Sequence, residues 1–129
     1  MKQSEISYRV PYADTDQMGV VYYANYLIYF ERVRNELLRE HSIPYTELEA
    51  QGVMLPVVEA YCKYISSAHY DDLLTIRGWV DQIKGVRIKI ACEVLRGDER
   101  LMLGHTVHAC MSPEGRLVRP PQELKIFLT

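Results

Sequence analysis

Two carboxylates and a glycine stand immediately before the first helical pattern of this chain, a combination that can carry acid, base or nucleophilic chemistry. Asp14 and Asp16 follow an extended segment, and Gly19 precedes two valines and an apolar pattern with helical spacing. The first turn of a helix has unpaired backbone N–H groups and a partial positive charge, so it can bind a carboxylate, a phosphate or a developing oxyanion. A carboxylate a few residues upstream could then act on an electrophile that those N–H groups hold.

Each acidic residue also has a structural interpretation. Asp16 could satisfy backbone N–H groups in a helix-entry turn without taking part in chemistry. For Asp14 we expect a structural role, in which it anchors the loop through backbone hydrogen bonds. Glu31, on the predicted helix, is a second candidate carboxylate, but we expect it to pair with Arg34 or Arg32.

The segment around these residues resembles the signature of a known enzyme family. Its pattern is Arg9-Val10, four residues, Thr15-Asp16, two residues, Gly19-Val20-Val21 and then Tyr26. In residue type and spacing it is similar to the 4-hydroxybenzoyl-CoA thioesterase family of hotdog-fold acyl-CoA thioesterases. The likeness continues more loosely through residues 29–34 and 68–74, so that it covers roughly residues 6 to 112.

The resemblance implies roles for particular residues. Asp16 falls on the family's catalytic aspartate, and Gly19 and Val20 fall where the backbone meets the substrate. The segment that ends at Asn25 would carry the oxyanion donors, with the backbone N–H of Tyr23 as the main one. Gly19 could instead be an ordinary loop glycine. A related branch, associated with the Tol-Pal envelope system, commonly has histidine at the position of Tyr23, so the branch and the acyl group stay open.

The implied substrate is an acyl-CoA, and its phosphates would need cations. Lys84 and Arg87, around a predicted turn between the third and fourth strands, are candidates by position. We expect no metal or redox cofactor. His105 and His108 lie an odd number of residues apart on a predicted strand, so they should face opposite sides of the sheet and cannot bind one ion together.

The remaining nucleophiles point to no other chemistry. The cysteines are widely spaced and include no Cys-x-x-Cys motif, so we expect buried, reduced thiols at Cys62, Cys92 and Cys110. No Gly-x-Ser-x-Gly motif is present, and a serine hydrolase is therefore not supported.

Composition narrows the class of protein. With 129 residues, 48% hydrophobic and 25% charged, the chain is expected to form a single domain over residues 1–129. Its net charge of −2 argues against wholesale nucleic-acid binding. No run approaches the ~18 apolar residues of a membrane span, and the polar N-terminus does not resemble a signal peptide. We expect a cytoplasmic protein without integral membrane association.

Hydrophobic periodicity predicts an α+β fold. A helix is expected at 24–41, a short helical segment at 45–48 and another after Pro121; strands are expected at 5–12, 53–65, 72–83, 86–97 and 101–111. On the fourth strand, polar residues alternate with apolar ones, so one face of the sheet should be polar. The resemblance implies the hotdog fold, in which an antiparallel sheet of about five strands wraps around one long helix.

We therefore expect an acyl-CoA thioesterase in which Asp16 acts either as nucleophile or as general base; the sequence leaves both open. A non-catalytic acyl-CoA-binding protein could share the same pocket. A hotdog dehydratase is less well supported, because the helix-entry motif offers no histidine paired with an acid. The resemblance and the open edges of the predicted sheet favour a homodimer or homotetramer.

Overall fold

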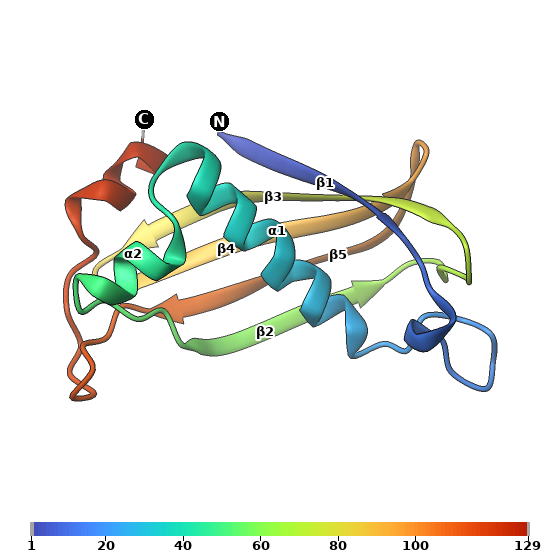
Figure 1. Cartoon of the computed structure of the whole chain (residues 1–129), viewed down its shortest axis with the longest axis horizontal. Coiled ribbons are helices and arrows are strands. Elements are labelled where there is room, and N and C mark those ends of the chain that lie inside the picture. Colours follow the sequence, from blue (N-terminus) through green and yellow to red (C-terminus); the bar gives the residue numbers. More distant parts are fainter. Residues whose placement is uncertain (1, 129) are drawn as a thin grey trace.

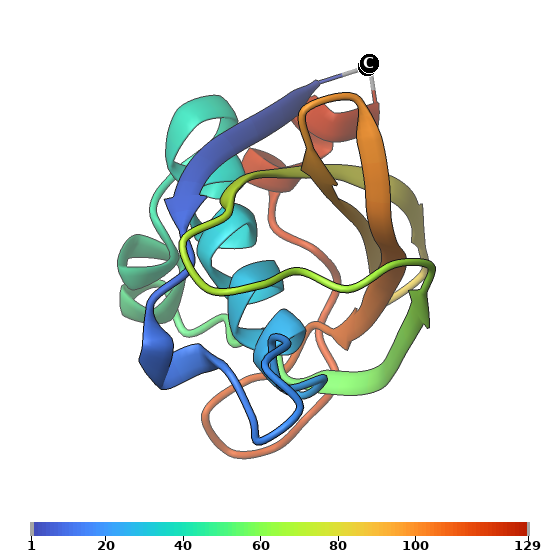
Figure 2. The ribbon, with the colours of Figure 1, turned by 90° about the vertical axis from the view of Figure 1, so that its right-hand side faces the viewer.

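The computed structural model describes residues 2–128 as a curved antiparallel sheet with one long helix on its concave side (Figures 1 and 2). The strands are β1 (Gln3–Arg9), β2 (Val57–Tyr64), β3 (Leu73–Lys84), β4 (Arg87–Arg96) and β5 (Glu99–Ala109). They pair in the order β1-β3-β4-β5-β2, and every pair is antiparallel. The predicted fold class is confirmed.

The long helix, α1 (Asn25–His41), buries one face against the sheet, as its apolar spacing predicts. Two strand glycines let it come close. A Cβ added to Gly78 would lie 3.0 Å from Val33, and one added to Gly104 would lie 2.9 Å from Phe30 and 2.2 Å from the Tyr61 carbonyl oxygen. These positions therefore set how deeply α1 sits in the sheet.

Most predicted elements are confirmed to within two residues, but the first two strands are shorter than predicted. β1 ends at Arg9, because Pro11 is followed by the 3-10 turn η1 (Tyr12–Asp14), whose Asp14 N–H donates to the Pro11 carbonyl. β2 begins only at Val57, after Pro56, which has no N–H to donate to a strand ladder. The loop that carries Asp14 is thereby freed from the sheet.

Two short helices close the end of the sheet where β3 meets β4. They are α2 (Tyr45–Ala50) and η2 (Gln122–Leu128), which correspond to the short helical segments predicted after Pro44 and Pro121. Leu48 and Leu124, one from each, are buried in the second of two apolar clusters in the core. The first cluster lies around Tyr29 and Phe30 near the start of α1.

The outer face of the sheet, which points away from α1, is only partly polar and solvated. Lys89 and Arg87 reach the surface there, but Glu93 is only 5% exposed. Its carboxylate accepts hydrogen bonds from Arg77 at 2.8 Å and from Arg100 at 3.0 Å. The predicted polar face is therefore confirmed at its centre, where charged side chains cover one another and keep Glu93 from solvent.

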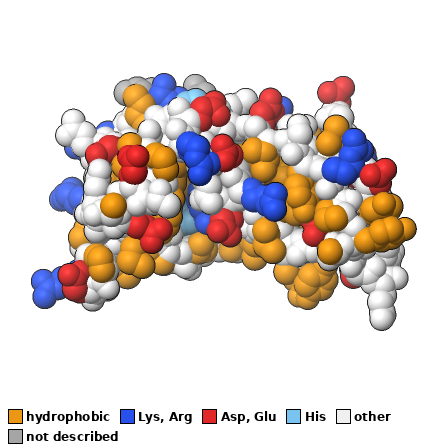
Figure 3. All heavy atoms as spheres, viewed as in Figure 1, with side chains coloured by type: hydrophobic (Ala, Val, Ile, Leu, Met, Phe, Trp, Pro, Cys, Tyr) orange, Lys and Arg blue, Asp and Glu red, His pale blue; other side chains and the backbone are white. Residues whose placement is uncertain are grey.

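The three cysteines are free thiols, but only two are buried as expected. Burial raises the pKa of Cys92 to about 12 and that of Cys110 to about 11. Cys62 is only partly buried, because β2 is an edge strand. Along β2, Val57, Val58, Tyr61 and Tyr64 are 45–51% exposed. In Figure 3 hydrophobic side chains gather along the lower rim and at the right-hand end of the molecule.

No helix among residues 2–128 is long and apolar enough to cross a membrane.

Candidate active site

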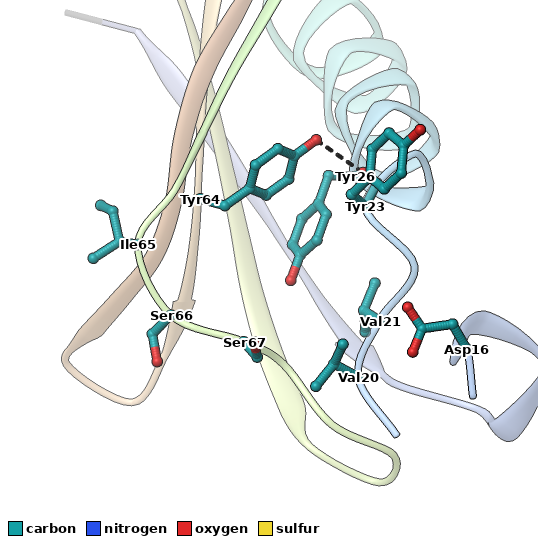
Figure 4. A pocket seen from close by; sticks show the side chains of 9 residues that line it. All are labelled: Asp16, Val20, Val21, Tyr23, Tyr26, Tyr64, Ile65, Ser66 and Ser67. Carbon is teal, nitrogen blue, oxygen red and sulfur yellow. Dashed lines mark hydrogen bonds between the residues drawn. The ribbon is translucent and has the colours of Figure 1, made fainter. Parts of the chain in front are cut away.

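A pocket of about 230 Å³ opens where the N-terminus of α1 meets the end of β2. Its lining comes from three segments: the loop before α1, the first turn of α1 and the loop after β2. Figure 4 shows the Tyr26 ring between the strand-like segment of Val20 and Val21 on one side and Ser66 on the other. The full lining is Asp16, Val20, Val21, Tyr23, Tyr26, Tyr64, Ile65, Ser66 and Ser67.

Asp16 begins a tight turn, and this turn leaves half of its carboxylate unused. Oδ1 accepts the Met18 N–H at 2.9 Å, and the Asp16 carbonyl accepts the Gly19 N–H at 3.0 Å. Gly19 has φ +79°, a conformation that favours glycine. Oδ2 takes part in no hydrogen bond among residues 2–128. The structural and the catalytic interpretations of Asp16 are therefore compatible, because each uses a different oxygen.

The helix entrance supplies free donors on the same pocket. Among the hydrogen bonds of the described residues, none is donated by the backbone N–H of Tyr23 or Ala24. The Tyr23 carbonyl is held in place, because it accepts the Tyr64 hydroxyl at 3.0 Å (Figure 4). Unpaired N–H groups at a helix N-terminus are the donors that can stabilise an oxyanion.

Asp14 ties the loop to both the sheet and the helix. Its Oδ2 accepts the Tyr8 hydroxyl of β1 at 2.6 Å and the Tyr29 hydroxyl of α1 at 2.7 Å. Its backbone carbonyl accepts the Asn25 amide at 2.8 Å and the Tyr22 N–H at 2.9 Å. Asp14 therefore anchors the loop through backbone hydrogen bonds, as expected, and its carboxylate adds two bonds to tyrosine hydroxyls that were not expected.

These hydroxyls are held in their protonated, donating form. Burial, followed by the hydrogen bond to Asp14, raises the pKa of Tyr8 to about 12 and raises the pKa of Tyr29 further. The predicted substrate contact of Asn25 stays a prediction; its amide donates to the loop, and Asn25 is not among the pocket residues. We refer to Asp14, Tyr8, Tyr29 and Asn25 as the Asp14 tie.

The opposite wall of the pocket is fixed by a second carboxylate that the sequence did not single out. Asp72 accepts the His69 N–H at 2.8 Å and the Arg96 guanidinium at 2.7 Å, and Arg96 also donates to the Ser67 carbonyl at 3.2 Å. Although burial alone would raise the pKa of Asp72, these donors lower it below the usual range. The loop that carries Ser66 is thus held at both ends.

Two further candidates lie elsewhere. Lys84 and Arg87 form a cross-strand pair at the far end of β3, a strand of 12 residues that spans roughly 35 Å and begins beside the pocket (Figure 1). Within one chain they do not line the Asp16 pocket. Glu31 forms no direct ion pair with Arg34 or Arg32 among the described residues, but its charge acts on Arg34, where it opposes the lowering of the Arg34 pKa by burial. The Arg32 guanidinium lies 5.0 Å from the Tyr8 ring centroid.

The histidines lie on opposite faces, as predicted. His108 is buried on the inner face between Thr106 Oγ1 and the Leu55 carbonyl, and His105 lies on the outer face. Within residues 2–128 no three His, Cys, Asp or Glu side chains are grouped so that they could hold a metal ion.

Comparison with known proteins gives the chain its family. Residues 10–128 match the model of the thioesterase-like superfamily, and the chain belongs to this family. It is 36% identical to the acyl-CoA thioesterase YbgC of Haemophilus influenzae over 119 residues, which cover 91% of this chain and 88% of that protein. The crystal structure of a probable thioesterase from Bartonella henselae is 33% identical, with a TM-score of 0.86 over 92% of this chain and 99% of that one.

The fold is the hotdog fold. A solved 4-hydroxybenzoyl-CoA thioesterase, 17% identical, has the same fold with a TM-score of 0.88 over the full length of both chains. The protein is an acyl-CoA thioesterase, a hydrolase that cleaves an acyl-CoA thioester to a free acid and CoA. The predicted family, fold and reaction are confirmed.

Proposed function

We propose that acyl-CoA is hydrolysed in the pocket at the start of α1, with Asp16 as the catalytic carboxylate and the Tyr23 N–H as the oxyanion donor. The observation that carries this proposal is that Asp16 and Tyr23 line the same pocket, Asp16 with one carboxylate oxygen and Tyr23 with a backbone N–H that make no hydrogen bond within residues 2–128. The thioester carbonyl would accept the N–H bond, and the negative charge that develops on its oxygen would strengthen that bond in the transition state.

Two reaction sequences fit this arrangement. As a general base, Asp16 takes a proton from a water molecule while the water oxygen attacks the thioester carbon; the C–S bond then breaks, and the CoA sulfur leaves and takes up a proton. As a nucleophile, Asp16 Oδ2 attacks the carbon directly and expels the thiolate, and water hydrolyses the resulting anhydride. Neither sequence calls for a metal or a redox cofactor.

The decisive experiment is Asp16→Asn, because asparagine keeps the size and the turn hydrogen bond but cannot act as base or nucleophile. We expect kcat to fall roughly 10²–10⁴-fold, with acyl-CoA affinity and melting temperature nearly unchanged. Thiol release reports turnover, and calorimetry with a non-hydrolysable analogue reports binding. A folded variant with wild-type turnover would exclude Asp16, and Glu31 would be the next carboxylate to test.

The two sequences can be separated with the wild-type enzyme. In single-turnover hydrolysis in ¹⁸O-labelled water, with enzyme in excess, label in the peptide that contains Asp16 would identify the nucleophilic sequence with water attack at the Asp16 carbon of the anhydride. Trapping with hydroxylamine tests for an anhydride that water opens at the acyl carbon, and the general-base sequence predicts neither label nor trapped product on Asp16. A protein that binds the analogue but never releases thiol would be an acyl-CoA-binding protein without activity.

We further propose a cytoplasmic homodimer or homotetramer. The exposed apolar side chains of edge strand β2 support pairing with a second copy, because an open hydrophobic edge favours association. Antiparallel pairing of two β2 strands about a two-fold axis would bring the partner's hairpin between β3 and β4 to the pocket end. Contacts of Lys84 and Arg87 with CoA phosphates are therefore proposed only across that interface. A stable monomer by sedimentation at micromolar concentration would exclude this assembly.

A further inference from the structure

The Asp16 pocket is closed on one side, where its two walls are joined through the backbone. The Val21 N–H donates to the Ala68 carbonyl at 2.8 Å, and Val20 pairs with His69 as an isolated β-bridge. These contacts connect the segment before α1 to the loop after β2. An acyl chain therefore cannot leave the pocket between these two walls.

The Tyr26 ring forms the inner wall of the pocket. Tyr26 is only 3% exposed, and Figure 4 shows its ring between the two joined walls. The rings of Tyr29 and Tyr64 meet it edge to face, with centroids 5.5 and 5.4 Å away. Because the Tyr26 ring cannot turn aside unless these neighbours move, it is a fixed end of the pocket.

The space in front of the Tyr26 ring is small. The pocket has a volume of about 230 Å³, whereas an apolar cavity of about 150 Å³ holds a single benzene ring. If the thioester lies beside Asp16 and the Tyr23 N–H, only part of this volume is left for the acyl group. A long acyl chain would have to displace the ring, so the pocket suits a short one.

The Tyr26 hydroxyl differs from those of the two neighbouring tyrosines. Tyr29 donates to Asp14 and Tyr64 donates to the Tyr23 carbonyl, but Tyr26 donates its proton to no acceptor within residues 2–128. Buried tyrosine hydroxyls usually have a hydrogen-bond partner. The acceptor must therefore come from the contents of the pocket, which are solvent in the free enzyme and the acyl group in the complex.

Other hydroxyl groups surround the same space. In Figure 4 the Tyr26 hydroxyl points toward the loop of Ser66 and Ser67, and neither serine hydroxyl forms a hydrogen bond within residues 2–128. Burial raises the pKa of Tyr26 more than the Ala68 backbone and the Arg96 charge lower it, so Tyr26 stays protonated at neutral pH. A hydroxyl on the acyl group could accept the Tyr26 proton and donate its own to a serine oxygen.

We propose that Tyr26 selects the acyl group: its ring limits the chain to a few carbons, and its hydroxyl binds a hydroxyl group that the chain carries. A site that binds a substrate hydroxyl discriminates against the analogue without it, because a polar group of the site then stays unpaired. The inference rests on the proposed function, since it assumes that the thioester lies between Asp16 and the Tyr23 N–H.

The role of the hydroxyl is tested with butyryl-CoA and 3-hydroxybutyryl-CoA, which differ by one oxygen. Tyr26→Phe removes the Tyr26 hydroxyl and keeps the ring. It should lower the ratio of kcat/KM for 3-hydroxybutyryl-CoA to kcat/KM for butyryl-CoA about tenfold. Tyr70→Phe is the matched control, because Tyr70 is exposed and lies outside the pocket on the same loop. This control should leave the ratio at its wild-type value.

The role of the ring is tested with butyryl-CoA and octanoyl-CoA. Wild type should hydrolyse butyryl-CoA with a kcat/KM at least about tenfold higher than that for octanoyl-CoA. Tyr26→Leu keeps an apolar side chain in the core but shortens it, so it should raise the relative kcat/KM for octanoyl-CoA about tenfold. Thermal melts show whether the variants are folded, and the wild-type comparison decides the length limit if Tyr26→Leu is not.

Equal effects of Tyr26→Phe on both four-carbon substrates would overturn the role of the hydroxyl. Equal kcat/KM values of wild type for butyryl-CoA and octanoyl-CoA, or an unchanged length profile in folded Tyr26→Leu, would overturn the limit on length. Asp16→Asn is measured alongside. If Asp16→Asn loses turnover while the Tyr26 variants keep wild-type ratios, only this inference fails. If Asp16→Asn keeps wild-type turnover, the proposed function fails and this inference fails with it.

Discussion

The two ends of the sheet use polar side chains in opposite ways. At the pocket end, one oxygen of Asp14 and one of Asp72 each accept two donors from different segments, and these bonds fix the walls around Asp16 and the Tyr23 N–H. At the hairpin end, Lys84 and Arg87 make no hydrogen bond or ion pair within residues 2–128 and, as a cross-strand pair, repel each other. Chemistry requires atoms held at fixed spacing, which internal hydrogen bonds provide, whereas charge recognition tolerates mobile side chains.

The largest effect on the free energy of unfolding is expected from a substitution in the middle of the sheet, which should affect both ends together. Gly104→Ala would place a Cβ against the Tyr61 carbonyl and the Phe30 ring, midway between the two sites. The backbone contact cannot yield as a side chain can, so we expect a loss of about 3 kcal/mol in the free energy of unfolding. Denaturant unfolding of wild type and variant measures this loss, and Gly97→Ala is no substitute because its positive φ adds a different strain. If the Gly104→Ala variant were as stable as wild type, the prediction would be wrong, because β2 could then shift away from the added Cβ at no cost.

Lowering the pH should reduce the free energy of unfolding through His108, a buried residue near the hairpin end of the sheet. Burial, opposed only partly by the hydrogen bond to Leu55, lowers the pKa of His108 to about 4. Because the folded pKa lies below the unfolded value of about 6.5, the unfolded state binds more protons as pH falls. Stability is then fully present above pH 6.5, and about 2 kcal/mol should be lost between pH 7.5 and pH 5.

His108→Gln provides the matched comparison, since other groups also titrate in this range. Unfolding free energies of both proteins at pH 7.5 and pH 5 give the difference that belongs to His108. The variant should lose less stability than wild type on acidification. Equal losses would show that His108 has an ordinary pKa in the folded protein.

The sequence predicts a feature of either end of the sheet only when the residues that form it lie close together in the chain. Helical and alternating periodicities are local, and they correctly located α1 and the strands. The helix-entry turn from Asp16 to Gly19 could be predicted because it spans only four residues. The partners of Asp14 could not be found, because Tyr8 and Tyr29 lie 6 and 15 residues away on different elements.

The position of the hairpin end relative to the pocket could not be predicted, for a related reason. Closeness to a turn identified Lys84 and Arg87 as exposed cations, but only strand order tells which end of the sheet a turn occupies. The β-bulge at Asp81, where the register of β3 shifts between Val80 and Gln82, could not be predicted either, since one extra residue in a strand does not change its composition. Asp72 and Arg96 escaped notice because their pairing crosses 24 residues.

A smaller change should affect the pocket end alone. Tyr29→Phe removes one of the two hydroxyls on Asp14 Oδ2 and keeps the ring that packs in the core. We expect a loss of about 1 kcal/mol in stability and a fall of about tenfold in kcat with KM nearly unchanged, since the tie positions Asp16 relative to the helix entrance. Tyr12→Phe, in the same loop, is the control, because its exposed hydroxyl does not contact Asp14. Equal kinetics of the two variants would refute the positioning role.

The smallest predicted effect is a gain at the hairpin end. Asp81 neutralises part of the charge on Lys89, and both side chains are at least one-third exposed, with relative exposures of 47% and 36%. Their pairing should therefore contribute less than about 0.5 kcal/mol to stability. Pyrophosphate serves as a probe for the CoA phosphates. Removing the carboxylate with Asp81→Asn should raise the affinity for pyrophosphate about two- to threefold at low salt, as expected for one unit charge several ångströms from the ligand in a medium close to water.

The control is Asp98→Asn, in the exposed turn between β4 and β5. It makes the same change in net charge at the other end of the sheet and should leave the affinity for pyrophosphate unchanged. If both variants bind pyrophosphate equally well, net charge governs the binding and the cations of the β3–β4 hairpin have no local role; if only Asp81→Asn binds it more tightly, the phosphates lie beside Lys89.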